Sequence, residues 1–356
     1  MADSVDWALA EQVAARFAGT DDFAESYHAA GMAADFERLT TEAQGYVEAE
    51  VGFSSLAGPA RARVVDRTDW VRANLASYRR LLRPVLDQME ERMTGPLAMV
   101  SGKVAGAELG ALLGWMSGRV LGQYDLLVLE DEDPHDQDVV YYVGTNILAL
   151  EKRHSFPPEQ FRLWVALHEV THRTQFTGVP WMREHFLGLV SGLLGDADID
   201  PSKLFTALGR VAEGIRTRTN PLDDGGISAL FASPGQREVM EDLAGLMSLL
   251  EGHGDVTMDR AALSRVPQAD RFARVLRARR KEMGLAQRLL TRLIGLEAKL
   301  NQYEQGEQFI EAVENVGGPQ LLNRAFETPA NLPSRAEILA PASWIDRVAP
   351  GVQLAG

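Results

Sequence analysis

The sequence predicts an α+β protein that is predominantly α-helical, and three features of the chain lead to that expectation. From Trp7 to about Gly122, alanine, leucine and arginine recur at the 3.6-residue spacing of amphipathic helices. Residues 125–130 (DLLVLE) and 139–147 (VVYYVGTNI) are instead rich in leucine, β-branched and aromatic residues, which indicates two strands of a small sheet. A helix with clear start and stop signals follows these strands at once.

This order of elements divides the chain into two parts. We expect residues 1–124 to form a large helical N-terminal region, interrupted near Gly58-Pro59 and Gly95-Pro96. Residues 125–356 are expected to form a core that holds the sheet, the helix after it and the C-terminal helices. The two parts should pack together as one wrapped unit.

Composition narrows the class of protein. The chain has 356 residues, of which 46% are hydrophobic, so it can bury a substantial core. A net charge of −14 argues against a nucleic-acid binder, because phosphate neutralisation needs a basic surface. There is no cysteine, which excludes disulfides and thiolate ligands. The first residues lack the basic region and apolar run of a secretory signal, and we expect a cytoplasmic protein.

Glycine recurs every four residues in SGKVAGAELGALLGWMSGRVLG, at positions 102, 106, 110, 114, 118 and 122. That period places the glycines along one helix face, where a second helix can approach closely. Such seams also occur in membrane helices. Here Lys103, Glu108 and Arg119 interrupt the run, which leaves no uncharged stretch of 18 residues. We expect a tightly packed helix and no integral membrane segment.

The helix after the predicted strands contains the sequence ALHEVTHRTQF. Pro157-Pro158 starts this helix, and Gly178 followed by Pro180 ends it. Within it, His168, Glu169 and His172 follow the order His-Glu-x-x-His. Because the chain has only seven histidines, composition alone predicts on the order of 0.01 occurrences of this pattern.

Helical spacing explains why this pattern indicates chemistry. His168 and His172 continue the apolar face formed by Phe161 and Val165, so both imidazoles face the interior one turn apart. Two such imidazoles can bind one Zn²⁺ ion through their ring nitrogens. Glu169 lies about 100° round the helix. A carboxylate beside the ion's open position is what a zinc-activated water requires as a general base.

A catalytic zinc usually has three protein ligands, and the third must come from elsewhere in this chain. The extended metzincin pattern is absent, because Gln175 and Gly178 stand where that pattern has glycine and histidine. Glu251 is the first candidate, since it continues the apolar stripe of Met240, Leu243 and Met247. His253 is the alternative third ligand. His154, His185 and Asp255 remain further possibilities.

The segments HEVTHRTQF and LLEGHGDVTMD resemble the zincin-like metallopeptidase family, whose members are often labelled as associated with biosynthesis of a deazaflavin coenzyme. The likeness extends through VLGQYDL, YYVGTNI, NQYEQGEQF and NLPSRAEILAPASWIDRV, so it covers most of the chain. The resemblance implies a zincin-like core, zinc at His168 and His172, and Glu169 as base. Glu251-Gly252 is similar to the Glu-Gly pair of gluzincins, whose glutamate is the third ligand. Two departures are Arg173, where the consensus favours an uncharged residue, and the long interval between His172 and Glu251.

These observations predict a zinc-dependent hydrolase that acts on a peptide or protein substrate. The strand at 139–147, directly before the motif helix, is expected to be an edge strand that pairs with extended substrate. The alternative is a catalytically silent zincin-fold protein that serves in binding or assembly, with a link to coenzyme metabolism. A retained Glu169 argues against that alternative, because a purely structural site has no use for a base.

Overall fold

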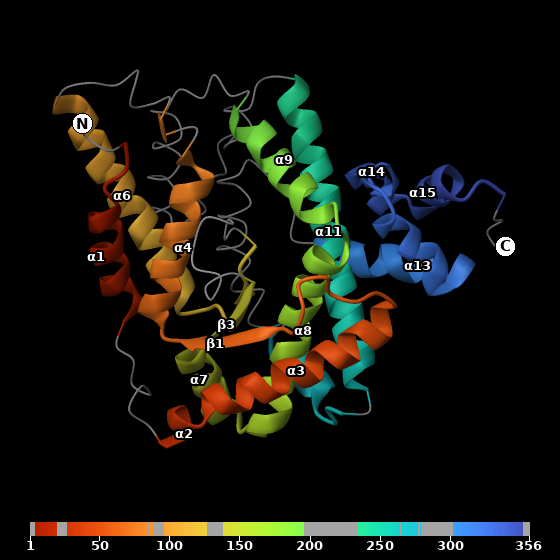
Figure 1. Ribbon diagram of the computed structural model, residues 1–356, viewed down its shortest axis with the longest axis horizontal. Helices are drawn as coiled ribbons and strands as arrows, with labels where there is room; N and C mark the ends of the chain where they lie inside the picture. The colour runs from red at the N-terminus through yellow and green to blue at the C-terminus, as the bar shows by residue number, and fades with distance from the viewer. Residues whose placement is uncertain are drawn as a thin grey trace.

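A computed structural model describes residues 4–19, 27–83, 86–87, 96–126, 138–195, 234–263, 265–276, 278 and 302–351. Across these residues the protein is predominantly α-helical, with one small mixed sheet, as the sequence predicts (Figure 1). Helices α1 (Trp7–Ala18), α4 (Arg67–Leu81) and α6 (Pro96–Ser117) lie together at one side of the molecule. Helices α13 (Gln302–Asn323), α14 (Arg335–Leu339) and α15 (Pro341–Val348) lie at the other side.

The sheet has three strands in the order β1-β3-β2. β1 (Arg61–Val65) runs parallel to β3 (Val139–Val143), and β2 (Gly122–Tyr124) runs antiparallel to it. All five residues of β3 are buried, which agrees with a strand covered on both faces. β1 and β2 precede the predicted boundary at residue 124, whereas β3 follows it, so both parts of the chain build the sheet. The boundary itself stays a prediction.

The structure confirms part of the strand predictions and corrects the rest. The strand expected at 139–147 ends at Val143, and helix α7 (Gly144–His154) begins at once. Of the strand expected at 125–130, residues 125 and 126 belong to no strand, and the remainder lies outside the described residues. β2 ends directly before this segment, at Tyr124. β1 lies within the N-terminal stretch expected to be helical, just after the predicted break at Gly58-Pro59, and it is a strand that the sequence analysis does not predict. Because β3 is central, with a neighbour on each side, it cannot be the edge strand that pairs with substrate.

The glycines at positions 106, 110 and 114 of α6 pack on α1, as their four-residue period predicts. The helix is shorter than expected, because α6 ends at Ser117, Gly118 lies beyond it and Gly122 begins β2. A Cβ atom built on Gly106, Gly110 or Gly114 would lie 2.2–2.5 Å from a backbone carbonyl oxygen of α1 or its N-cap. Those oxygens belong to residues 6, 10 and 14, which also recur every four positions. Glycine is therefore required for these two backbones to approach. In the part of the chain that the structure describes, no helix is long and apolar enough to cross a membrane.

The helix that contains the His-Glu-x-x-His pattern is α8 (Pro158–Gly178), with the bounds that the sequence signals predict. It packs on α3 (Met32–Val51) and on the sheet. The core formed there includes the fully buried side chains of Phe36, Tyr142 and Phe161. Because α8 is enclosed on these sides, its position in the fold is set by apolar packing along most of its length.

Helix α11 (Pro234–Ala262) packs against α8 and crosses α13. Pro234 is favourable at the first position of a helix, and α11 is described from there. Gly252 and Gly254 in turn favour a helix end near Glu251, and that expectation is wrong. α11 continues through Gly252 and Gly254, so Glu251 lies well inside it. Glycine disfavours helices by about 1 kcal/mol in isolation. Here both glycines lie where another group approaches closely, as described below, and the packing offsets that cost.

Candidate metal centre

Two imidazoles on α8 turn toward each other. His168 and His172 are one helical turn apart, and their Nε2 atoms are 3.3 Å apart. Two ligand atoms bound to one tetrahedral zinc ion at 2.0–2.1 Å lie about 3.3 Å from each other. The side chains are 18% and 17% exposed, so the site is accessible from outside although most of α8 is buried.

The facing helix α11 brings a carboxylate to the same point. Glu251 Oε2 lies 3.7 Å from His172 Nε2. One ligand atom from each of His168, His172 and Glu251 lies within 4.8 Å of the other two. Two imidazole nitrogens and one carboxylate oxygen form a donor set typical of catalytic zinc. The residues present therefore fit a divalent metal ion.

Each histidine has a polar partner on its other ring nitrogen. Gln175 Oε1 lies at hydrogen-bond distance from His172 Nδ1, 3.0 Å, whereas Asp255 Oδ1 lies 3.7 Å from His168 Nδ1, beyond hydrogen-bond range but close enough for an ionic contact. Such partners orient metal-binding imidazoles, so that Nε2 is left for the metal. The two histidines and the two acids are each four residues apart on helices that run in opposite directions. This spacing places His172 beside Glu251 and His168 beside Asp255.

The local charge is negative. Burial acts to lower the pKa of His172, but the negative charges of Glu251 and Glu169 outweigh it, so the pKa lies above its ordinary value. Glu169 and Asp255 are themselves buried. Buried carboxylates are costly without a compensating cation. A bound metal ion would supply that positive charge.

Glu169 lies against the backbone at the start of β2. A Cβ atom built on Gly122 would be 2.5 Å from Glu169 Cγ and 2.9 Å from Oε1. Glu169, the base proposed from the sequence, is therefore confined between α8 and the sheet. The residue as a whole is only 8% exposed. The absence of a side chain at position 122 makes room for the carboxylate.

His253, the alternative third ligand, is outside the group formed by the three ligand atoms. Its ring is buried against Phe326, with centroids 4.9 Å apart, and its Nδ1 is 3.0 Å from Gln175 Nε2. Burial lowers the pKa of His253 to about 3, so this imidazole is neutral. The two other histidines considered are also elsewhere: His154 stacks on Phe156, and His185 contacts Trp181.

The two glycines beside His253 have separate contacts. A Cβ atom on Gly254 would be 3.1 Å from Cε1 of His172, so the α11 backbone passes directly behind that imidazole. A Cβ atom on Gly252 would be 2.5 Å from the carbonyl carbon of Gly306 in α13. Gly254 thus makes room for the side chain of a candidate ligand, and Gly252 makes room for a crossing helix.

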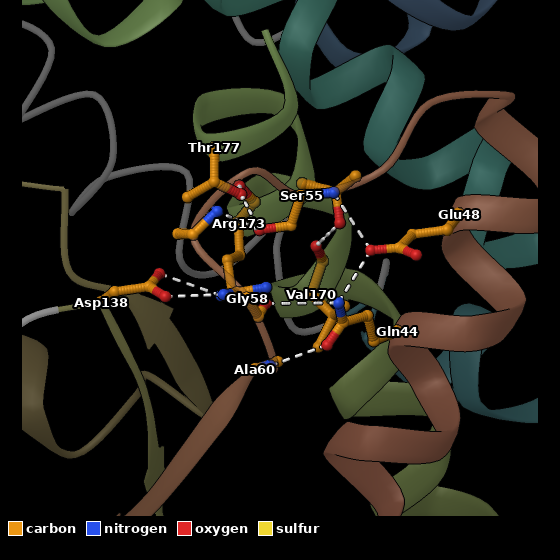
Figure 2. Close-up of polar contacts among 11 residues, drawn as sticks. Gln44, Glu48, Ser55, Gly58, Ala60, Asp138, Val170, Arg173 and Thr177 are labelled. Carbon is orange, nitrogen blue, oxygen red and sulfur yellow. Dashed lines mark hydrogen bonds and ion pairs between the residues drawn. The ribbon is translucent and has the colours of Figure 1, made fainter. Parts of the chain in front are cut away.

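Arg173 follows the second histidine and has a structural partner. Its guanidinium forms two bonds with Asp138, at 2.9 and 2.6 Å, and also donates to the Gly58 carbonyl (Figure 2). The Arg173 side chain is fully buried. It therefore ties α8 to the start of β3 and to the segment before β1. The departure from the zincin consensus is explained by this ion pair, which involves none of the three ligand atoms.

Sequence reasoning missed three contributors to the site. Asp255 was considered only as a ligand, although its four-residue offset from Glu251 matches the offset between the two histidines. Gln175 appeared only as a departure from the metzincin pattern. Gly122 was noticed as the last member of the glycine series, but its contact with Glu169 depends on the three-dimensional path of β2 and has no local signal.

Taken together, the fold and the His-His-Glu group define a candidate metallohydrolase. The sequence profile of the family described as zincin-like metallopeptidase matches residues 5–345. A crystal structure from Chloroflexus aurantiacus, described as a "putative hydrolase with a novel fold", is similar to this chain. The two are 30% identical, the likeness covers 97% of this chain and 99% of that one, and the TM-score is 0.73. No protein of curated function matches the chain.

The chain belongs to the zincin-like metallopeptidase family. Family membership and the grouped His168, His172 and Glu251 together support a zinc hydrolase in general.

Proposed function

We propose that this protein is a zinc-dependent peptidase in which His168, His172 and Glu251 bind the metal and Glu169 is the general base. The observation that supports it best is the convergence of three ligand atoms from two facing helices. Their identity matches the His-His-Glu set of catalytic zinc sites. A structural site would normally be closed by a fourth protein ligand, whereas both histidines here remain partly exposed.

Zinc bound at this site would act as a Lewis acid and lower the pKa of water toward ~7. Glu169 is one residue from His168 and contacts the backbone at Gly122, so its carboxylate is held in one place. It would accept the proton of the attacking water and deliver it to the leaving amine. Asp255 and Gln175 would keep the two imidazoles oriented while this happens.

The position of β2 supports an extended peptide as substrate. β2 is an edge strand of the described sheet, and it begins at Gly122, in contact with Glu169. A peptide that adds to this edge as a further strand would bring its backbone carbonyls close to the proposed base. In this proposal β2 takes the role that the sequence had suggested for the strand after residue 138.

Metal content is the first test. Purified wild-type protein should contain close to one zinc per chain, and His168→Ala should reduce zinc to background. Arg183→Ala, which removes a partly buried side chain on α9 (Met182–Gly195) outside the ligand group, is the matched control and should retain the metal. Equal zinc in wild type and His168→Ala would contradict the site.

The second test separates metal binding from hydrolysis. Glu169→Gln preserves shape but cannot accept a proton, so it should keep its zinc and lose hydrolysis of peptides found by library profiling. The expected loss is about 10²- to 10⁴-fold. Full activity in Glu169→Gln would show that Glu169 is not the general base. Zinc binding with no hydrolysis by the wild type would instead favour a silent binding or assembly protein.

A further inference from the structure

The amide of Gln175 makes three contacts in the interior of the protein. Gln175 lies three residues after His172 on α8 and is fully buried. Its Oε1 is 3.0 Å from His172 Nδ1. Its Nε2 is 2.9 Å from the carbonyl oxygen of Leu250 and 3.0 Å from His253 Nδ1.

These contacts determine the direction of each hydrogen bond. The Leu250 carbonyl can only accept, so the amide nitrogen of Gln175 must face it. The second N–H of the same amide then donates to His253 Nδ1. The remaining atom, Oε1, can only accept, and it faces His172 Nδ1. That nitrogen of His172 must therefore carry a hydrogen, which leaves Nε2 as the nitrogen with the free lone pair.

The same amide connects the two helices that supply the candidate ligands. Leu250 directly precedes Glu251 in α11, while Gln175 and His172 are in α8. A reversed amide would place its oxygen against the Leu250 oxygen, so the rest of the structure disfavours that orientation. His168 differs, because its Nδ1 lies 3.7 Å from Asp255 Oδ1, beyond hydrogen-bond range.

We propose that Gln175 is a positioning residue that holds His172 in the Nδ1–H tautomer and aligns it with Glu251. The proposal rests on the proposed function to the extent that the selected Nε2 is the atom that binds zinc. Gln175 does not touch the metal or the substrate in this proposal. It acts through His172, and its effect should therefore appear in metal affinity and in the state of that imidazole.

The tautomer can be measured in the wild-type protein without metal or substrate. Long-range ¹⁵N–¹H NMR spectra distinguish the two neutral forms of a histidine, provided that they are recorded above the pH at which the imidazole loses its charge. We expect His172 to carry its hydrogen on Nδ1. A predominant Nε2–H form in the wild type would overturn the proposal, and no variant has to fold for this result.

Gln175→Met tests the effect on the metal. Methionine is similar in length and apolar, so it fills the space but cannot accept from His172 or donate to Leu250. We expect the zinc dissociation constant to rise by about 10- to 100-fold, as for other residues that orient metal-binding histidines. His172 in the metal-free variant should also become a mixture of both tautomers.

Thr174→Val is the matched control. Thr174 is fully buried on the same turn of α8, and its hydroxyl donates to the Val170 carbonyl at 2.9 Å rather than to a histidine. It should leave the zinc dissociation constant and the His172 spectrum unchanged. A folded Gln175→Met variant with wild-type zinc affinity would contradict the proposal. If the wild-type protein binds no zinc, the proposed function fails, whereas the tautomer spectrum still decides the role of Gln175.

Discussion

In two helix pairs of this molecule, glycine lets the two helices approach closely, and the two contacts have different consequences. In the α1–α6 pair, glycines face backbone carbonyls at regular intervals, and none of the three candidate ligands belongs to either helix. In the α8–α11 pair, Gly254 faces the imidazole of His172. The first contact sets the distance between two helices, whereas the second sets the position of one candidate ligand. Figure 1 shows the two pairs in separate parts of the fold.

This difference predicts that substitutions in the two pairs will have separable consequences. Substitutions that disrupt the α1–α6 contact should reduce the stability of the protein without changing its zinc affinity. Damage near the candidate metal centre should change zinc affinity or hydrolysis with a smaller effect on stability.

Gly110→Ala should have the largest effect. The new Cβ would lie 2.2 Å from the Ala10 carbonyl oxygen, and neither backbone can move without separating the helices. We expect a loss of roughly 3 kcal/mol in the free energy of unfolding, at the upper end for overpacking. Chemical denaturation measures this loss, with zinc per folded chain as the second readout.

The control is Gly45→Ala in α3, where a Cβ would meet nothing within 4 Å. This helix-interior change should be neutral or should stabilise by up to about 1 kcal/mol. A Gly110→Ala protein as stable as Gly45→Ala would show that the glycine seam is dispensable.

Gly122→Ala should reduce hydrolysis while zinc stays bound. Its Cβ would collide with the Glu169 side chain, so the base must move away from its position between α8 and β2. A displacement of about 1 Å in a catalytic group can lower the rate by about 100-fold. Peptide turnover and zinc content should be measured on the same sample. Unchanged turnover would mean that the placement of Glu169 does not depend on this backbone contact.

Gly254→Ala should have a moderate effect on zinc affinity. Its Cβ would be 3.1 Å from Cε1 of His172, a distance that the imidazole can relieve by shifting a few tenths of an ångström. We expect the zinc dissociation constant to rise by about 10-fold, which corresponds to about 1.4 kcal/mol. Competition with a chromophoric chelator measures this change. The zinc affinity of folded Gly110→Ala should stay close to that of the wild type. If folded Gly110→Ala lost more zinc than Gly254→Ala, the proposed difference between the two helix pairs would be wrong.

The smallest effect concerns Glu108 on α6. Burial raises the pKa of this carboxyl to about 7, and its Oε2 has no hydrogen-bond partner among the described residues. The unfolded carboxyl loses its proton near pH 4.5, so the folded state is destabilised progressively as the pH rises from there to about 7. Glu108→Gln should remove this pH-dependent destabilisation, because the amide does not titrate. Because the side chain is partly solvated, we expect a difference on the order of 1 kcal/mol between the two ends of that range.

Unfolding followed at several pH values tests this prediction. The stability difference between Glu108→Gln and wild type should grow as the pH rises toward 7, in favour of the variant. A difference that is independent of pH would show that Glu108 titrates normally.

The sequence predicted the motif helix well because its information is local. Pro158 and Gly178 mark the ends of α8, and the four-residue interval between His168 and His172 places both on one face. The glycine seam of α6 was predictable for the same reason. The grouping of Glu251 with the two histidines agrees with the preferred third ligand, and its role in binding metal stays a prediction.

The errors involve contacts between distant parts of the chain. Gly252 and Gly254 resemble the end of a helix, but contacts with Gly306 and His172 keep α11 continuous there. α7 begins within the predicted strand, where the Asn146 side chain donates to the Ser117 and Val120 carbonyls at the end of α6. Neither contact can be inferred from neighbouring residues, because tertiary packing overrides local propensity.

The central claim is that one zinc ion is held between α8 and α11, and anomalous diffraction from crystals grown with zinc tests it most directly. Data recorded on either side of the zinc absorption edge should give one strong peak per chain, with His168 Nε2, His172 Nε2 and a Glu251 carboxylate oxygen each about 2.0–2.2 Å away. His253 should remain hydrogen-bonded to Gln175 and outside the coordination sphere. A peak coordinated by His253 in place of Glu251, or the absence of a peak between the two helices, would contradict the account.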